Sequence, residues 1–403
     1  MKEKDNKMDL KKSSRNYTID LFRFIFSIGF VFGHLSIILG RLPGRENATK
    51  SLYALDTLAV FICIAGFFMM RSIRRACKEE GSSENAVGLA WTYLKSRIRT
   101  LGVWFLVGNI GGFIGLMLFT KVPFGNWFDA FLNHLGEFFG LMLTGFNYGT
   151  AAAPYGSTTS EYMLINGPLW FISGLFITSY LLYYLICKNE KKTLGVIIPM
   201  VSLLFYGSMY LNGVTMPFWH NFADIGYFKI NLAMIDMFCN LGIGCLMYVA
   251  VEKLEGKEFT KTFTWILTII QIFLLIFIPF RTLYPTNGPL NPFTFNWGPA
   301  YLLSLIFTFL LVLNRDYATK FLNRKIFGKL GSISMHVYCL HYMVIILLYC
   351  LSPEIAAANT RLYILSVLLV TIVISILAKL VSPAIDKYLL SSPWFKKEKE
   401  TVK

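Results

Sequence analysis

Long apolar segments separated by short polar stretches dominate the hydropathy pattern of this chain. Ten segments are long enough, at ~1.5 Å of helical rise per residue, to cross the apolar core of a bilayer. They cover residues 17–40, 53–70, 97–118, 165–187, 194–211, 232–250, 263–280, 297–313, 330–351 and 361–381. The apolar segment 127–146 is interrupted by Asp129, His134 and Glu137, so we expect it to be interfacial or re-entrant. The pattern predicts an all-α, polytopic membrane protein with about ten transmembrane helices.

The composition supports a membrane location, and the charge distribution predicts the topology. Of the 403 residues, 55% are hydrophobic and 15% are charged, which is too apolar for a soluble domain. Most of the 38 Lys and Arg residues lie in the two terminal tails and in alternate loops, whereas the opposite loops hold few. This asymmetry predicts a multi-pass protein of the cell membrane with both termini cytoplasmic. The net charge of +15 is therefore a topology signal, and we expect no nucleic-acid partner.

The predicted topology divides the chain into three regions. Residues 1–16 form a cytoplasmic polar N-terminal tail, residues 17–381 form the ten-helix domain, and residues 382–403 form a cytoplasmic C-terminal tail. The seven Cys residues show neither paired spacing nor metal-ligand spacing, so we expect no disulfide framework and no metal site. The sequence indicates no internal duplication, which argues against a transporter built from symmetric halves.

Two ionisable side chains mark one stripe of the first span. Arg23 and His34 are eleven positions apart, which brings an α-helix back to nearly the same face ~16 Å further along. With the predicted topology, Arg23 lies near the cytoplasmic surface and His34 lies in the outer half of the bilayer. Ionisable groups inside a span are costly and usually serve function. The structural alternative is an arginine that extends to the interface and a histidine that joins packed helices.

Further candidates lie at both ends of the second span. Asp56, one turn into this span, lies near the predicted depth of His34 and could orient and polarise it. The alternative is an interfacial cap that faces water. At the cytoplasmic end, guanidinium groups gather that match the geometry of phosphate. A polyphosphorylated cytosolic donor could bind this cluster, which could equally be ordinary positive-inside anchoring. Its arginines are Arg23, Arg71, Arg74, Arg97 and Arg99.

Polar and aromatic residues also mark the fourth and ninth spans. Trp170 opens the fourth span, where it could belong to an aromatic belt, and Glu161 precedes it as an acid that could simply be solvated. In the ninth span Ser334, Tyr338 and His341 follow i, i+4, i+7 spacing on one face. This stripe could line the same cavity as His34, or it could only hold helices together by hydrogen bonds.

Four motifs, in this order and at these positions relative to the spans, resemble the acyltransferase-3 superfamily of integral membrane acyltransferases. They are IDLFR with Arg23, followed after ten residues by His34; AGFFMMRSIR with Arg71 and Arg74; GPLWFISG with Trp170; and SISMHVYCLH with Tyr338 and His341. Ala65 stands where the superfamily usually has a serine before the glycine of the second span. In this resemblance the first-span histidine is the catalytic residue, and the arginine pair after the second span handles the acyl donor.

The resemblance implies a membrane O-acyltransferase that moves an acyl group, often acetyl, from cytosolic acyl-CoA to a hydroxyl of an extracytoplasmic glycan or cell-envelope molecule. Acyl-CoA would be the donor substrate, and we expect no permanently bound cofactor. His34 would act as a general base or carry the acyl group briefly. The superfamily often has an acidic residue nearer the glycine of the second span, which is absent here, so Asp56 as the partner of His34 is our own inference from its position. Trp170, Glu161, Tyr338 and His341 would line the acceptor site or the cavity. The alternatives are a permease or exporter of a glycan or small solute, and a sensor with a degenerate site. The partners would be the lipid bilayer, acyl-CoA and the acceptor, and a homo-oligomer is compatible with the sequence.

Overall fold

The computed structural model describes residues 15–39, 57–80, 83–137, 167–211, 222–225, 228–283, 298–392 and 394–395. The longer helices are α1 (Tyr17–Leu39), α2 (Thr57–Glu80), α3 (Ala86–Phe119), α4 (Trp127–Glu137), α5 (Trp170–Lys188), α7 (Ile198–Leu211), α8 (Leu232–Leu254), α9 (Lys261–Leu283), α10 (Gly298–Leu313), α13 (Ser334–Leu351) and α15 (Thr360–Ser391). The short elements are η2 (Phe124–Asn126), η4 (Gly167–Leu169), α6 (Glu190–Lys192), η5 (Thr193–Ile197), β1 (Phe222–Ile225), β2 (Phe228–Asn231), α11 (Tyr317–Leu322), α12 (Lys325–Gly331) and α14 (Pro353–Ala358). The described fold is therefore helical apart from one antiparallel hairpin, β1–β2.

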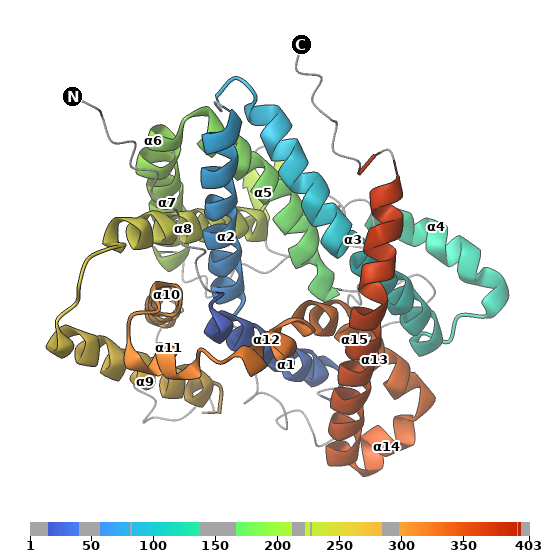
Figure 1. Cartoon of the computed structure of the whole chain (residues 1–403). Helices are drawn as coiled ribbons and strands as arrows, with labels where there is room; N and C mark the ends of the chain where they lie inside the picture. Colours follow the sequence, from blue (N-terminus) through green and yellow to red (C-terminus); the bar gives the residue numbers. More distant parts are fainter. Residues whose placement is uncertain are drawn as a thin grey trace, which may run out of the picture.

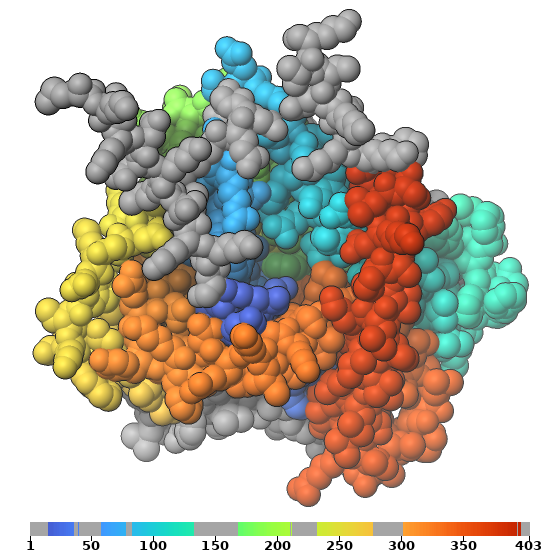
Figure 2. All heavy atoms as spheres, viewed as in Figure 1, coloured from blue at the N-terminus to red at the C-terminus, as the bar shows by residue number. Residues whose placement is uncertain are grey.

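The helices confirm the predicted all-α membrane fold. Within the described residues, seven helical stretches are long and apolar enough to cross a membrane, and they contain α1, α3, α5, α7, α8, α13 and α15. Shorter apolar stretches lie in α9 and α10, and the number of ten spans stays a prediction. On the face shown in Figure 2, α15 forms a continuous red ridge. Its apolar side chains Leu365, Leu369, Val373 and Leu380 are exposed, as expected for a helix that faces lipid.

Three helices extend well beyond the spans that the hydropathy pattern predicts. α2 continues to Glu80, past residue 70; α3 begins at Ala86 rather than near residue 97; and α15 continues to Ser391, past residue 381. The extra turns contain charged side chains, which lower the hydropathy without ending the helix. The predicted boundary between the membrane domain and the C-terminal tail thus falls inside one continuous helix.

Helices α2 and α8 pack closely against each other and cross in Figure 1. A Cβ atom added at Gly66 would lie 2.1 Å from the Leu241 carbonyl oxygen, and one added at Gly244 would lie 2.0 Å from the Cys63 carbonyl oxygen. Each glycine therefore lets the backbone of the partner helix approach directly, as small residues do in membrane helix packing. The Cys245 thiol donates to the Gly66 carbonyl across the same crossing.

The first helix is fixed at its beginning by segments from the last third of the chain. The Tyr17 backbone N–H donates to Asn323 Oδ1 at 2.8 Å, and the Thr18 hydroxyl donates to the Thr319 carbonyl, also at 2.8 Å. Thr319 belongs to α11, and Asn323 follows its last residue. These contacts satisfy polar groups in the first turn of α1 and set the position from which its side chains project.

Helix α13 lies at the centre of the site-bearing half of the molecule. It packs against α1, α3 and α15 (Figure 1). Its predicted polar stripe points inward, because Ser334, Tyr338 and His341 are all buried. His336 lies on another face, where its Nε2 is 2.9 Å from the Ser382 hydroxyl of α15.

Candidate active site

Two imidazole rings meet inside the helix bundle. His34 on α1 and His341 on α13 lie with Nδ1 of His34 2.9 Å from Nε2 of His341. Their ring centroids are 5.0 Å apart, with the planes tilted by 39°. The contact joins residues 307 positions apart in the sequence, so the tertiary fold alone creates this pair.

The ring of His341 is held on its other side by its own helix. Its Nδ1 lies 2.7 Å from the Tyr338 carbonyl oxygen and 3.1 Å from that of Val337. The His341 residue is completely buried. His34 is partly accessible within the structure, and the Tyr342 ring meets it edge-on at 6.1 Å. The pair therefore consists of one fully enclosed histidine and one with an accessible surface.

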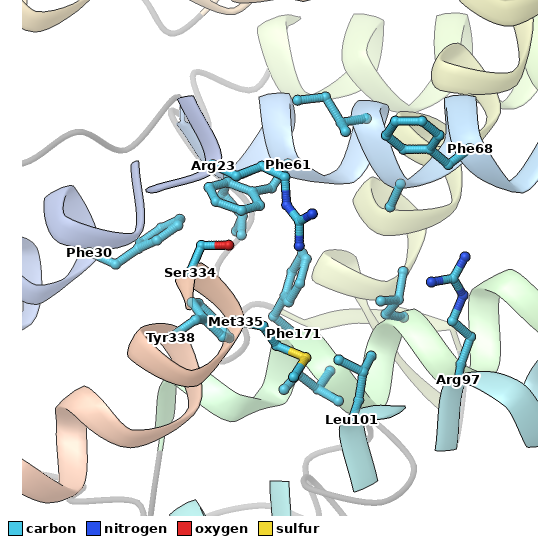
Figure 3. A pocket seen from close by; sticks show the side chains of 15 residues that line it. Arg23, Phe30, Phe61, Phe68, Arg97, Leu101, Phe171, Ser334, Met335 and Tyr338 are labelled. Carbon is cyan, nitrogen blue, oxygen red and sulfur yellow. The ribbon is translucent and has the colours of Figure 1, made fainter. Parts of the chain in front are cut away.

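Beside the histidine pair lies a cavity of about 170 Å³ between α1, α2, α3, α5 and α13. Most of its wall is apolar. In Figure 3 the guanidinium of Arg23 points into the cavity from α1, and Arg97 lies at another side on α3. The other lining residues are Phe30, Leu58, Phe61, Ile64, Ala65, Phe68, Leu101, Phe171, Ile172, Leu175, Ser334, Met335 and Tyr338.

The cavity carries two positive charges. Neither Arg23 nor Arg97 forms an ion pair with any of the described residues. The Arg97 guanidinium lies over the Tyr93 ring, 4.8 Å from its centroid, which orients it by a cation–π contact. Two arginines that form no ion pair within the described part of the chain, next to an apolar chamber, suit a ligand with an anionic part and a long apolar part.

Aromatic rings separate this cavity from the histidine pair. Phe30 stacks on His34, with centroids 6.4 Å apart and planes 23° apart, and its other side faces the cavity. The Tyr338 ring lies 5.4 Å from Phe30 and 5.9 Å from His341. The Tyr338 hydroxyl donates to the Pro168 carbonyl at the start of α5. Phe30 and Tyr338, here called the aromatic wall, thus contact the cavity on one side and the two imidazoles on the other.

The structure distributes the predicted donor-binding arginines over different environments. Arg23 and Arg97 share the cavity, whereas Arg74 is held by two carboxylates, at 2.6 Å from Glu190 and 3.1 Å from Glu252. Arg74 therefore connects α2 to the α5–α6 junction and to α8.

The two remaining predicted arginines lie outside the cavity lining. The Arg99 Nε lies 3.9 Å from an Asp386 carboxylate oxygen on α15. Arg71 lies on α2, close enough to Tyr248 to interact electrostatically with it. The arginines of the predicted cluster thus differ in their partners, although all of them are on neighbouring helices.

The other predicted site residues divide into described and undescribed ones. Trp170 is buried in the main hydrophobic cluster at the start of α5, and Tyr338 lines the cavity. Asp56 and Glu161 lie outside the described residues, so their predicted roles stay predictions. Within the described part of the chain, no three His, Cys, Asp or Glu side chains are grouped so that they could hold a metal ion.

The sequence reasoning missed the aromatic lining of the cavity. Phe30 precedes His34 by one helical turn, so its position on the same face was visible in the spacing. Phe61 and Phe171 carried no such signal, because this chain contains 36 phenylalanines and most of them lie in apolar spans.

The fold and the site together define a multi-helix membrane protein with an intramembrane histidine pair beside a cationic, largely apolar cavity. The sequence matches the acyltransferase-3 family, described as an acyltransferase domain, over residues 16–380. The chain belongs to this family and is a membrane acyltransferase. No curated protein and no solved structure shows significant similarity in our comparisons.

Proposed function

We propose that this protein transfers an acyl group, acetyl in particular, from cytosolic acyl-CoA to a hydroxyl of an extracytoplasmic glycan or cell-envelope molecule, with His34 as the catalytic base. The observation that carries the proposal is the cavity of about 170 Å³, which has Arg23 and Arg97 in its lining and His34 directly behind its aromatic wall. The family membership supports acyl transfer, and the cavity supports a donor that is anionic at one end and slender at the other.

Acyl-CoA has the chemistry that this cavity matches. Its phosphates suit guanidinium groups, and its pantetheine arm and acyl group suit narrow apolar walls. The cavity is smaller than the ~300–1,000 Å³ of most ligand pockets, so the proposal places the slender arm and the thioester inside it, the phosphates against its arginines, and the nucleoside outside. Arg23 and Arg97 are then the leading donor-binding residues, and Arg71 contributes from the end of α2. Arg74 and Arg99 already face carboxylates.

In the proposed reaction, His34 removes the proton from the acceptor hydroxyl, and the oxygen attacks the thioester carbonyl. The new O–acyl bond forms, the C–S bond breaks, and the proton passes to the departing CoA thiolate. Phe30 and Tyr338 lie between the cavity and His34, so the thioester reaches the imidazole when these rings move aside. Closing the wall again would keep water away from the thioester.

The topology of the proposal follows the charge distribution of the loops. The Lys- and Arg-rich loops would lie in the cytoplasm, together with both termini, and the donor would enter from that side of the cell membrane. The acceptor hydroxyl would approach His34 from the opposite side, because this residue lies in the C-terminal half of α1, which would be the outer half in this topology.

The direct test measures labelled acetyl transfer from acetyl-CoA to a cell-envelope glycan extract, using purified protein in nanodiscs without any ion gradient. We expect transfer by the native protein and a loss of about 10²–10⁴-fold for His34→Ala, with acetyl-CoA binding retained. Arg23→Ala combined with Arg97→Ala is expected to weaken acetyl-CoA binding. Near-normal transfer by His34→Ala would overturn the catalytic role. Gradient-dependent movement of glycan without acetylated product would instead favour the permease alternative.

A further inference from the structure

The hydrogen bonds of the histidine pair determine which ring nitrogens carry protons. Each neutral imidazole has one N–H donor and one acceptor nitrogen. The Nδ1 atom of His341 faces two backbone carbonyl oxygens, at 2.7 Å and 3.1 Å, and carbonyl oxygens only accept. This nitrogen therefore carries the proton. In the neutral ring, the Nε2 atom of His341 must then be an acceptor.

The same logic assigns the proton on His34. Its Nδ1 lies 2.9 Å from the acceptor Nε2 of His341, so Nδ1 of His34 must donate. Its Nε2 then carries the lone pair. Both rings are neutral in this arrangement, which suits the interior of a membrane protein, because no described carboxylate pairs with either ring.

We propose that His341 is a positioning residue that holds His34 in the Nδ1–H tautomer and so makes Nε2 of His34 the atom that accepts the proton of the acceptor hydroxyl. This inference rests on the proposed acyl transfer with His34 as base. It adds the identity of the reacting atom and the residue that sets it, in the way that a partner on one ring nitrogen fixes the chemistry of the other.

The reverse assignment, with His341 as the base, conflicts with the contacts. Both nitrogens of His341 are occupied, one by backbone carbonyls and the other by His34. The ring of His34 contacts Nε2 of His341, and it also interacts with the backbone of Phe30, one helical turn earlier. His341 is completely buried, whereas His34 has an accessible surface. A substrate hydroxyl can therefore reach His34 and cannot reach His341.

Packing keeps the two rings in this relation. Val337 and Ile345 on α13 belong to the same buried cluster as Val31 and Leu35 on α1, so the two helices are fixed above and below the histidine contact. Phe30 covers one face of the His34 ring, and Tyr342 meets it edge-on. The packing of α1 against α13 therefore holds the two imidazoles in hydrogen-bond contact.

The test compares His341→Gln with His341→Leu in the acetyl-transfer assay. A glutamine amide oxygen can occupy the place of Nε2 and accept from His34, whereas leucine fills the space and cannot accept. We expect His341→Leu to lower kcat about 10–100-fold with KM for acetyl-CoA unchanged, and His341→Gln to recover most of this loss. The matched control is His336→Leu, which removes the other histidine of α13 from its contact with Ser382 and should retain kcat.

The outcomes separate this inference from the proposed function. If His34→Gln is inactive while His341→Leu and His341→Gln have equal kcat, the tautomer assignment fails and the catalytic role of His34 stands. If His34→Gln keeps native transfer, the proposed function fails and this inference fails with it. Nitrogen NMR shifts of ¹⁵N-labelled histidine give an independent reading, because the assignment requires protonated Nδ1 and unprotonated Nε2 on His34. The opposite pattern on His34 would overturn it even if the variants fail to fold.

Discussion

One side of α2 packs tightly against α8, and the other side lines the cavity. Two consecutive residues, Gly66 and Ala65, show this difference. Gly66 faces α8, where an added Cβ atom would lie 2.1 Å from the Leu241 carbonyl oxygen. Ala65 faces the other way and lines the cavity. On the first side two backbones touch and no space is left. On the second side, side chains from five helices enclose a chamber. A single helix thus anchors the bundle and shapes the site, so a substitution can affect stability or activity according to its face.

The two sides also differ in their polar contacts, because a buried network of hydrogen bonds involves α8. The Tyr206 hydroxyl donates to Asp236 at 3.0 Å, and the Tyr301 hydroxyl lies 2.9 Å from Tyr206 and 2.7 Å from Asn240 Oδ1. These contacts join α7, α8 and α10 in an interior where unsatisfied polar groups are costly. Around Arg23 and Arg97 the described residues form no network of this size: Arg23 interacts electrostatically with Asp20, and Arg97 with Tyr93.

The largest effect is expected from Gly66→Ala. The new methyl group would overlap a carbonyl oxygen of α8, so the two helices would have to separate, at a cost of about 3 kcal/mol. Thermal unfolding in detergent, together with size-exclusion profiles, measures this loss. The control is Gly207→Ala on α7, where nothing lies within 4 Å of the added atom and helix propensity improves by about 1 kcal/mol. Equal stability of the two variants would show that α2 and α8 do not touch in this way.

An intermediate effect, on activity rather than stability, is expected from Ala65→Leu. The larger side chain would enter the cavity of about 170 Å³ and compete with the donor for apolar space. We expect KM for acetyl-CoA to rise about 10-fold or more, because small volume changes in a hydrophobic pocket are worth ~1–3 kcal/mol. The unfolding temperature should stay near the native value. A large stability loss with unchanged KM would place Ala65 in the packed core instead of the cavity.

The smallest effects are expected from the two arginines at the end of α2. Arg74→Ala removes the cation between Glu190 and Glu252 and should cost about 1 kcal/mol of stability, because the three side chains are only partly buried. Arg71→Ala should leave the unfolding temperature unchanged and raise the dissociation constant of acetyl-CoA a few-fold. Binding titrations and thermal unfolding of both variants measure this split. The reverse split would assign the donor contact to Arg74.

Local periodicity predicted the parts of the site that lie on one helix. The eleven-residue spacing of Arg23 and His34, and the stripe of Ser334, Tyr338 and His341, needed only the geometry of an α-helix. The stripe was expected either to line the cavity of His34 or to join helices. In the structure Tyr338 lines the cavity and His341 hydrogen-bonds to His34, so both expectations apply to different residues.

Contacts between distant segments could not be read from the sequence. Arg74 was assigned the same donor-binding role as Arg71, because its partners Glu190 and Glu252 are 116 and 178 residues away and could not be recognised from the sequence. The sequence shows a glycine at position 66 but does not show why it is needed, because the carbonyl oxygen that leaves no room for a side chain belongs to another helix. The continuation of α15 past the predicted span end at residue 381 was not visible in the hydropathy, because charged residues lower the hydropathy of its last turns, whereas helix formation depends on packing and propensity as well.

The separation of 307 residues between His34 and His341 has a consequence for biosynthesis. At ~5–20 residues per second, α13 leaves the ribosome about 15–60 s after α1, so α1 waits in the bilayer without its main partners. The hydrogen bonds that fix the beginning of α1 also come from this late part of the chain. A prematurely terminated chain would therefore insert its early helices without assembling a histidine pair.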